Sequence, residues 1–225
     1  MAIRYARDAL SRIFFQRCFY LFVVLVALFI LAPLVPESDE GRFAANLVNA
    51  FVIVATVAAV GRTMFSFIVV LLLAAPTLFF QWLGLSINDM QLLAYSWMSG
   101  ALLYLATIVY LLQYVFRPNV MTTDKLFGAA AAYLMLGVFW GYLYRLTGYY
   151  SPAAFAVAGQ ATSLEFFDAL YFSITVLTST GFGDISPLTK EARAICMVEQ
   201  IVGVLFAGIL IARLASAYSE VQRQQ

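Results

Sequence analysis

The chain consists mainly of long apolar runs separated by short polar segments. A helix needs about 20 mostly apolar residues to cross the roughly 30 Å hydrocarbon core of a bilayer. Six runs approach that length with little or no charge, and they predict six transmembrane helices over residues 19–36, 43–60, 64–85, 91–116, 126–147 and 194–217. The expected fold class is therefore an all-α membrane protein.

Residues 163–178 form a seventh apolar stretch that differs from the other six. It is too short to cross a bilayer comfortably, it contains Glu165 and Asp168, and Gly181 and Gly183 follow it at once. A short apolar helix interrupted by glycines is typical of a re-entrant segment, which enters the membrane and leaves on the same side. We expect a re-entrant half-helix over this stretch.

Composition narrows the functional classes. Of the 225 residues, 64% are hydrophobic and 11% are charged, against about 45–50% and 25% in soluble domains. These values exclude a soluble enzyme, a disordered chain and a disulfide scaffold. The chain has no histidine, which excludes His-based catalytic triads and metal centres, and its net charge of +1 gives no reason to expect a nucleic-acid partner.

The distribution of charge predicts the topology. If the N-terminus is cytoplasmic, most of the 13 Lys and Arg residues lie on the inner side and most of the 12 Asp and Glu residues on the outer side. The inner excess of Lys and Arg favours two cytoplasmic termini, with an interfacial helix over residues 1–18 and a tail over residues 218–225. The outer acidic residues would either raise the local cation concentration or simply keep the loops soluble.

The segment after the half-helix carries the most specific signal. Non-helical backbone at membrane depth is tolerated only where it is buried or lines an aqueous path. Gly181 and Gly183 can adopt positive φ. Alternation of such residues with ordinary ones can turn successive carbonyls to one side, where they could replace the water around a dehydrated cation. The partly negative C-terminal end of the half-helix, at Thr178, would face that cation.

This segment resembles the selectivity filter of the tetrameric P-loop potassium channels. Their filter reads Thr-Val-Gly-Tyr-Gly-Asp, and residues 179–184 read Ser-Thr-Gly-Phe-Gly-Asp. The resemblance implies that K⁺ is bound by the carbonyls of four residues, with a fifth completing the filter and an acid at its outer mouth. The four carbonyl residues would be Ser179, Thr180, Gly181 and Phe182, and the Ser179 hydroxyl would also complete the innermost site. Gly183 would complete the filter, and Asp184 would be the acid at its outer mouth.

Three substitutions distinguish the loop from the family pattern. Ser179, Thr180 and Phe182 stand where the family has Thr, Val and Tyr. They leave a weakly selective cation channel as an alternative, although the retained Gly-x-Gly favours potassium. A remote alternative is an intramembrane aspartyl protease, because Gly-Phe-Gly-Asp184 also matches the Gly-x-Gly-Asp of those enzymes and Asp168 could supply the second carboxylate. We expect no enzyme, since neither aspartate lies in a predicted spanning helix.

The resemblance extends over residues 120–217. Gly203, followed by Gly208, occupies the place where the inner helix of the family commonly has its hinge glycine; close helix packing is the alternative reading. Thr122 or Thr123 would cap the outer helix of the pore domain.

An acid inside a predicted span requires a partner. Glu199 lies one turn before Gly203, where the resemblance places it behind the filter. Candidate partners are Thr175 and Tyr171 on the half-helix, which would support the filter together with Glu199, or Arg145. A structural hydrogen bond at a contact between subunits is the alternative.

The organisation follows from these assignments. Residues 19–116 would form a four-helix jacket, residues 117–125 a linker, and residues 126–217 a pore domain with pore helix 163–178, filter 179–184 and inner helix 194–217. The jacket lacks the regularly spaced arginines of voltage-gated relatives, so steep voltage gating is not expected. One loop supplies a quarter of a carbonyl ring, which predicts a homotetramer. The resemblance also implies a location in a bacterial inner membrane, contact with lipid, and no cofactor other than permeant K⁺.

Overall fold

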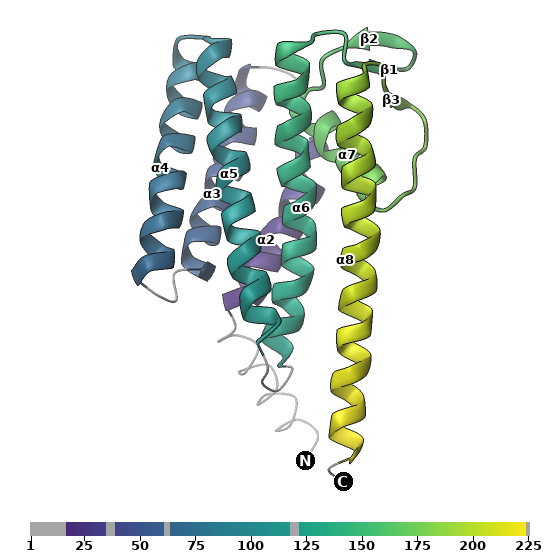
Figure 1. Ribbon diagram of the computed structural model, residues 1–225. Helices are drawn as coiled ribbons and strands as arrows, with labels where there is room; N and C mark the ends of the chain where they lie inside the picture. The colour runs from purple at the N-terminus through teal and green to yellow at the C-terminus, as the bar shows by residue number, and fades with distance from the viewer. Residues whose placement is uncertain (1–16, 35–38, 61–63, 118–121, 224–225) are drawn as a thin grey trace. The chain divides into compact units, whose positions relative to one another are not determined.

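The structure is a computed structural model that describes residues 17–34, 39–60, 64–117 and 122–223. Helices make up most of this part of the chain, and three short strands lie near one end of the last helix (Figure 1). The elements in chain order are α2 (Arg17–Leu31), the 3₁₀ helix η1 (Ala32–Leu34), α3 (Asp39–Val60), α4 (Met64–Ser86), α5 (Met90–Val115), α6 (Thr123–Tyr150), β1 (Phe155–Val157), β2 (Gln160–Thr162), α7 (Phe166–Leu177), β3 (Ile185–Pro187) and α8 (Lys190–Arg223). The expected interfacial helix over residues 1–18 falls almost wholly outside the described residues.

The described helices identify the chain as a multi-pass membrane protein. Within the described ranges, five segments are long and apolar enough to cross a bilayer: Arg17–Leu34, Met64–Ser86, Met90–Val115, Thr123–Tyr150 and Lys190–Arg213. The predicted span over residues 43–60 corresponds to α3, whose apolar part, Asn46–Ala59, is shorter than these. Its first turn carries Asp-Glu-Gly-Arg, and these polar residues shorten the apolar part.

Polar caps set helix boundaries that the apolar pattern alone misplaced. The apolar run predicts the outer helix from residue 126, whereas α6 begins at Thr123. The predicted cap at Thr122 is confirmed, because its hydroxyl accepts a hydrogen bond from the Lys125 amide at 3.4 Å. The Thr189 hydroxyl likewise accepts the Ala192 amide at 3.2 Å.

The inner helix and the pore helix also differ from their predicted bounds. The inner helix was predicted over residues 194–217, whereas α8 runs over Lys190–Arg223, so the helix continues into the residues assigned to the C-terminal tail. The pore helix was predicted over residues 163–178, whereas α7 is shorter, Phe166–Leu177, with Thr178 as its C-cap.

The chain divides into two compact units, and the division crosses three helices. One unit is Met1–Leu71 with Thr107–Leu134, and the other is Leu72–Ala106 with Met135–Gln225. The boundary therefore cuts α4, α5 and α6 instead of following the linker at residues 117–125. The separation into a jacket and a pore domain stays a prediction.

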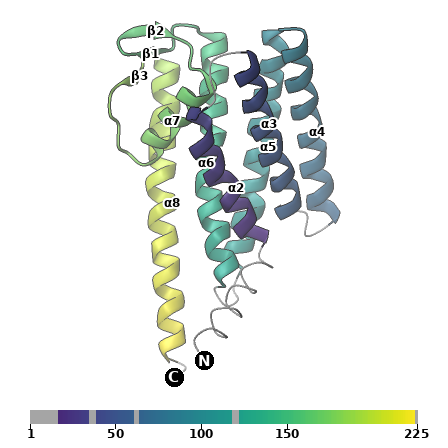
Figure 2. The same cartoon turned by 180° about the vertical axis from the view of Figure 1, so that it is seen from behind.

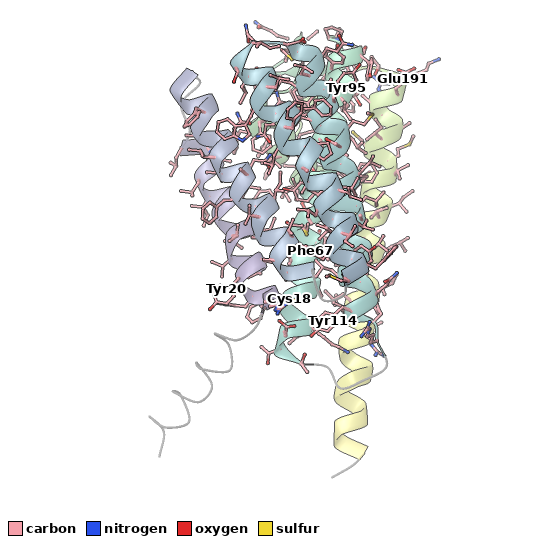
Figure 3. The ribbon with its side chains drawn as sticks, turned by 90° about the vertical axis from the view of Figure 1, so that its left-hand side faces the viewer. Cys18, Tyr20, Phe67, Tyr95, Tyr114 and Glu191 are labelled. Carbon is pink, nitrogen blue, oxygen red and sulfur yellow. The ribbon has the colours of Figure 1, made fainter. Side chains whose placement is uncertain are left out.

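In the first unit, a buried ionic group joins three helices. The Asp124 carboxylate accepts hydrogen bonds from the Cys18 amide at the start of α2, at 3.1 Å, and from the Tyr114 hydroxyl on α5, at 2.6 Å. Figure 3 shows Cys18 and Tyr114 near one another. The neighbouring Lys125 is only 1% exposed, and its ammonium group donates to the Arg117 carbonyl at 3.1 Å. These bonds fasten α2 and the end of α5 to the start of α6.

In the second unit, α7 packs along the first part of α8, and a small sheet lies beside them. The sheet has the strand order β2-β1-β3 and is antiparallel throughout, with Phe155 opposite Thr162 on one side and Pro187 on the other. Viewed from behind, the connection from α7 to β3 runs alongside α8 (Figure 2). The sequence pattern predicted no strands here.

Two glycines on α8 differ in their surroundings. A Cβ atom built on Gly203 would overlap the carbonyl oxygen of Leu177, the last residue of α7, so the absence of a side chain permits the two backbones to approach. No atom of the described residues lies within 4 Å of the corresponding position on Gly208. Since α8 continues unbroken through both, the packing role is seen at Gly203, and the hinge role of either glycine stays a prediction.

Substitution of these two glycines forms a matched pair. We expect Gly203→Ala to destabilise the protein by about 1–3 kcal/mol, because the added methyl must displace the backbone of α7. Gly208→Ala should leave stability unchanged or raise it by up to about 1 kcal/mol, since alanine favours a helix and meets no neighbour. Thermal unfolding of the detergent-solubilised variants measures both changes. Equal melting temperatures for the two variants would contradict the close contact at Gly203.

Candidate functional site

The candidate site is the loop that leaves α7 at Thr178 and enters β3 at Ile185. Its backbone alternates in handedness: φ is 56° at Ser179, 58° at Gly181 and 85° at Gly183, while the residues between them have negative φ. This alternation is the conformation expected to turn successive carbonyls toward one side. Two of the three positions are the glycines for which the sequence suggested it. The third, Ser179, adopts a conformation that disfavours a side chain and therefore needs support from its surroundings.

Backbone hydrogen bonds hold the start of the loop against α7. The Thr175 carbonyl accepts the amides of Thr180 at 2.8 Å and Gly181 at 3.3 Å, and the Val176 carbonyl accepts the Ser179 amide at 2.9 Å. The Thr175 hydroxyl donates to the Phe172 carbonyl within the helix. Thr175 therefore contacts the loop through its backbone, a role that its side-chain type does not indicate.

A second support acts near the C-terminal end of the loop. The Tyr171 hydroxyl on α7 donates to the Asp184 carboxylate at 2.8 Å, and this bond raises the pKa of Tyr171 above its ordinary value because it stabilises the protonated phenol. The Tyr171 ring also stacks on Phe182, with an interplanar angle of 7° and centroids 6.3 Å apart. A single α7 side chain thus contacts two of the loop residues that the sequence assigned to the filter.

Glu199 occupies a fully buried position on α8, behind α7. Its carboxylate accepts hydrogen bonds from the Ser173 hydroxyl on α7, at 2.5 Å, and from the Tyr144 hydroxyl on α6. These two partners differ from all three candidates that the sequence suggested. The carboxylate therefore links the helix that carries the loop to the helices on either side of it in the chain.

The side chains that the sequence suggests as partners of Glu199 have other contacts. Arg145 lies with its guanidinium 4.1 Å from the centre of the Trp97 ring and 4.0 Å from the Glu165 carboxylate. Tyr171 bonds to Asp184, and the Thr175 hydroxyl is bonded inside its own helix. The sequence pointed to the correct helices but to the wrong residues, because each partner lies one or two positions away from a candidate.

The loop is exposed in a single chain. All residues from Ser179 to Asp184 are exposed, and the Phe182 side chain is 70% exposed. Within the described residues, no group of three or more His, Cys, Asp or Glu side chains could hold a metal ion. The oxygen atoms that the loop itself offers are its backbone carbonyls, the hydroxyls of Ser179 and Thr180 and the Asp184 carboxylate.

Two features near the site have little signal in the sequence. Ser173 and Tyr144 lie within apolar stretches, and their only signal is a hydroxyl at a position that becomes buried. The β1–β2 hairpin carries Ala158-Gly159 at its turn, a weaker turn signal than Asn-Gly or Asp-Gly, between strands of three residues each.

Comparisons with known proteins agree with this location. The profile of a family described as "Ion channel" matches residues 126–220, which include α7, the loop and most of α8. Segments of the chain are also similar to two curated proteins: the Two-pore potassium channel 4 of Arabidopsis thaliana, 39% identical over 59 residues, and the Potassium channel protein kcv of Paramecium bursaria Chlorella virus 1, 38% identical over 52 residues.

These similarities are partial. The matched segments cover 26% and 23% of this chain, and they span 20% of the plant protein and 54% of the viral one. No solved structure matches the chain significantly. The second half of this multi-pass membrane protein is therefore similar to ion channels, and both of these curated relatives are named as potassium channels.

Proposed function

We propose that the chain is one subunit of a homotetrameric, potassium-selective channel that conducts K⁺ passively. The observation that carries this proposal is the alternation of positive and negative φ from Ser179 to Gly183, directly after a helix too short to cross a bilayer. The carbonyls of Ser179, Thr180, Gly181 and Phe182 would form the K⁺ sites, Gly183 would complete the filter, and Asp184 would lie at its outer mouth.

The tetramer is supported by what a single chain leaves uncovered. One loop supplies only a quarter of each carbonyl ring, and every residue of the loop is exposed. Much of α8 also presents large apolar side chains that no other described part of the chain covers, among them Ile201, Val204 and Leu205. Neighbouring subunits, the pore and lipid would together cover these surfaces.

The proposed arrangement in the membrane includes α3 as a sixth span, both termini in the cytoplasm, and a location in a bacterial inner membrane. Tyr171 and Glu199 would support the filter from its outer side and from behind, and Thr175 would do so through its carbonyl. Gly203 would permit the pore helix to contact the inner helix, and Gly208 would be the freer position for bending.

Ion flux into proteoliposomes tests the proposed function. The wild-type protein should carry K⁺ at least about tenfold faster than Na⁺, whereas Gly181→Ala should abolish K⁺ flux, since a methyl group disfavours φ of 58° and narrows the ion path. The variant should still fold, with a stability loss of only about 1–2 kcal/mol from the positive φ, because no described atom other than those of its chain neighbours lies within 4 Å of the added methyl.

Other results would revise the proposal in defined ways. Equal K⁺ and Na⁺ fluxes would replace it with a weakly selective cation channel. Normal selectivity in Gly181→Ala would show that this loop is not the filter, and a conducting monomer or dimer in native mass measurements would exclude the tetramer.

The Glu199 contacts predict an effect on gating. We expect Glu199→Gln to shorten the open periods by about three- to tenfold without a change in K⁺/Na⁺ selectivity, because it replaces one carboxyl oxygen with an NH2 group and so weakens a buried hydrogen bond behind the filter, worth about 0.5–1.5 kcal/mol. Tyr144→Phe should act in the same direction, and the double variant should be less than additive because the two side chains share one bond. Single-channel recordings provide the durations; additive effects would show that Glu199 acts separately from Tyr144.

The composition of the first helices predicts weak voltage dependence. The α4 and α5 helices contain no Lys or Arg, so the membrane field has no basic charge to move there. We expect an effective gating charge of about one per tetramer, against the 12–16 that three or four charges in each of four sensors would give. Conductance measured against voltage in a planar bilayer with symmetric K⁺ tests this; a steep sigmoid would show that the first helices sense voltage.

A further inference from the structure

The β1–β2 hairpin is joined directly to the strand by which the loop ends. Strand β3 begins at Ile185, one residue after Asp184, and pairs with β1 over all three of its residues. The ladder continues beyond the strands at both ends: the Ala158 amide donates to the Asp184 carbonyl at 3.0 Å, and the Leu188 amide donates to the Ala154 carbonyl at 2.8 Å. The backbone of Asp184 is therefore fixed by a hydrogen bond from the hairpin.

An aromatic anchor fixes the hairpin in turn. Phe155 on β1 is fully buried, and its ring lies 5.5 Å from that of Tyr144 and 5.7 Å from that of Phe172, centroid to centroid. Tyr144 donates to Glu199, and Phe172 lies on α7. The hairpin is consequently packed onto the same helices that support the loop, and its own hydrogen bonds reach the other end of that loop.

The turn of the hairpin is built from a residue poorly suited to its conformation. The two loop residues, Ala158 and Gly159, have φ of 49° and 81°, which is the all-positive pattern of a type I′ turn. Glycine adopts this conformation freely, but alanine does not, and asparagine is the residue preferred at the first position. Ala158 is exposed, so its side chain can be changed without a change in packing.

We propose that the β1–β2 hairpin is a positioning element that sets how stable the conductive conformation of the filter is. The proposal rests on the proposed channel function. The hairpin fixes the outer end of the loop through the Ala158–Asp184 bond and the β1–β3 ladder, so a change in the stability of the hairpin changes the population of the loop in its ordered form. Bound K⁺ favours the same ordered form, because ions bind the filter only when its carbonyls are arranged. A weaker hairpin therefore makes conduction more dependent on external K⁺.

Two substitutions at the exposed turn position test this in opposite directions. Ala158→Asn supplies the preferred residue and should lengthen the mean open time by about two- to fivefold, whereas Ala158→Val, with a β-branched side chain at positive φ, should shorten it by a similar factor. The K⁺ concentration needed on the hairpin side for half-maximal open probability should fall in the first variant and rise in the second. K⁺/Na⁺ selectivity should remain that of the wild type in both.

A matched control and a readout independent of conduction keep the test specific. Asn88 has φ of 52° in the turn between α4 and α5, so Asn88→Val imposes a similar local strain away from the loop and should leave open times unchanged. Hydrogen exchange of the backbone amides of residues 183–186 and 188 should become slower in Ala158→Asn and faster in Ala158→Val.

The outcomes separate the two proposals. Three results would overturn the role of the hairpin while the protein still conducts K⁺. The open times could be unchanged in both Ala158 variants, they could shift in the same direction in both, or Asn88→Val could shift them equally. A wild-type protein without K⁺ flux would overturn the channel function, and with it the proposal for the hairpin.

Discussion

A single buried carboxylate organises the helices around the candidate filter. A carboxyl group placed in a low-dielectric interior is costly unless it is hydrogen-bonded, and Glu199 accepts hydrogen bonds from Tyr144 on α6 and Ser173 on α7. The bonds are effective only if α6, α7 and α8 keep one relative placement at this level. The Tyr144 ring also packs on Phe172 and Phe155, so the apolar core and the polar group depend on the same side chain.

The loop from Ser179 to Asp184 has few features of its own that stabilise its conformation. It has positive φ at a serine as well as at two glycines, and its residues are exposed in a single chain. Its shape is imposed at both ends. The Thr175 carbonyl holds the first residues, while the Tyr171 side chain and the β1–β3 ladder hold the last. The adjoining parts of the fold therefore determine the conformation of the loop that we propose binds ions.

The sequence predicts those elements whose pattern extends over many residues or breaks a long apolar run. Apolar runs located the long helices, the short run with its glycines located α7 and the loop, and a lone acid in a span identified Glu199 as a residue in need of a partner. The partners themselves were not predictable. Ser173, Tyr144 and Phe155 are ordinary residues in apolar surroundings, and only the helix rotations and the path of residues 151–162 bring them together. The positive φ of Ser179 likewise results from neighbouring hydrogen bonds, not from its residue type.

The contact between Gly203 and the end of α7 separates α8 into a part that is held by α7 and a part that is not. Before that residue, the helix is in contact with α7, so any bend there would disturb the support of the loop. Beyond it, 20 further residues extend to Arg223, and at 1.5 Å per residue they form a lever about 30 Å long. At that length, a bend of about 10° beyond Gly203 would displace the C-terminal end of α8 by about 5 Å while the backbone contact stayed in place. The C-terminal part of α8 could thus move about Gly203 while the part in contact with α7, and with it the loop, kept its geometry.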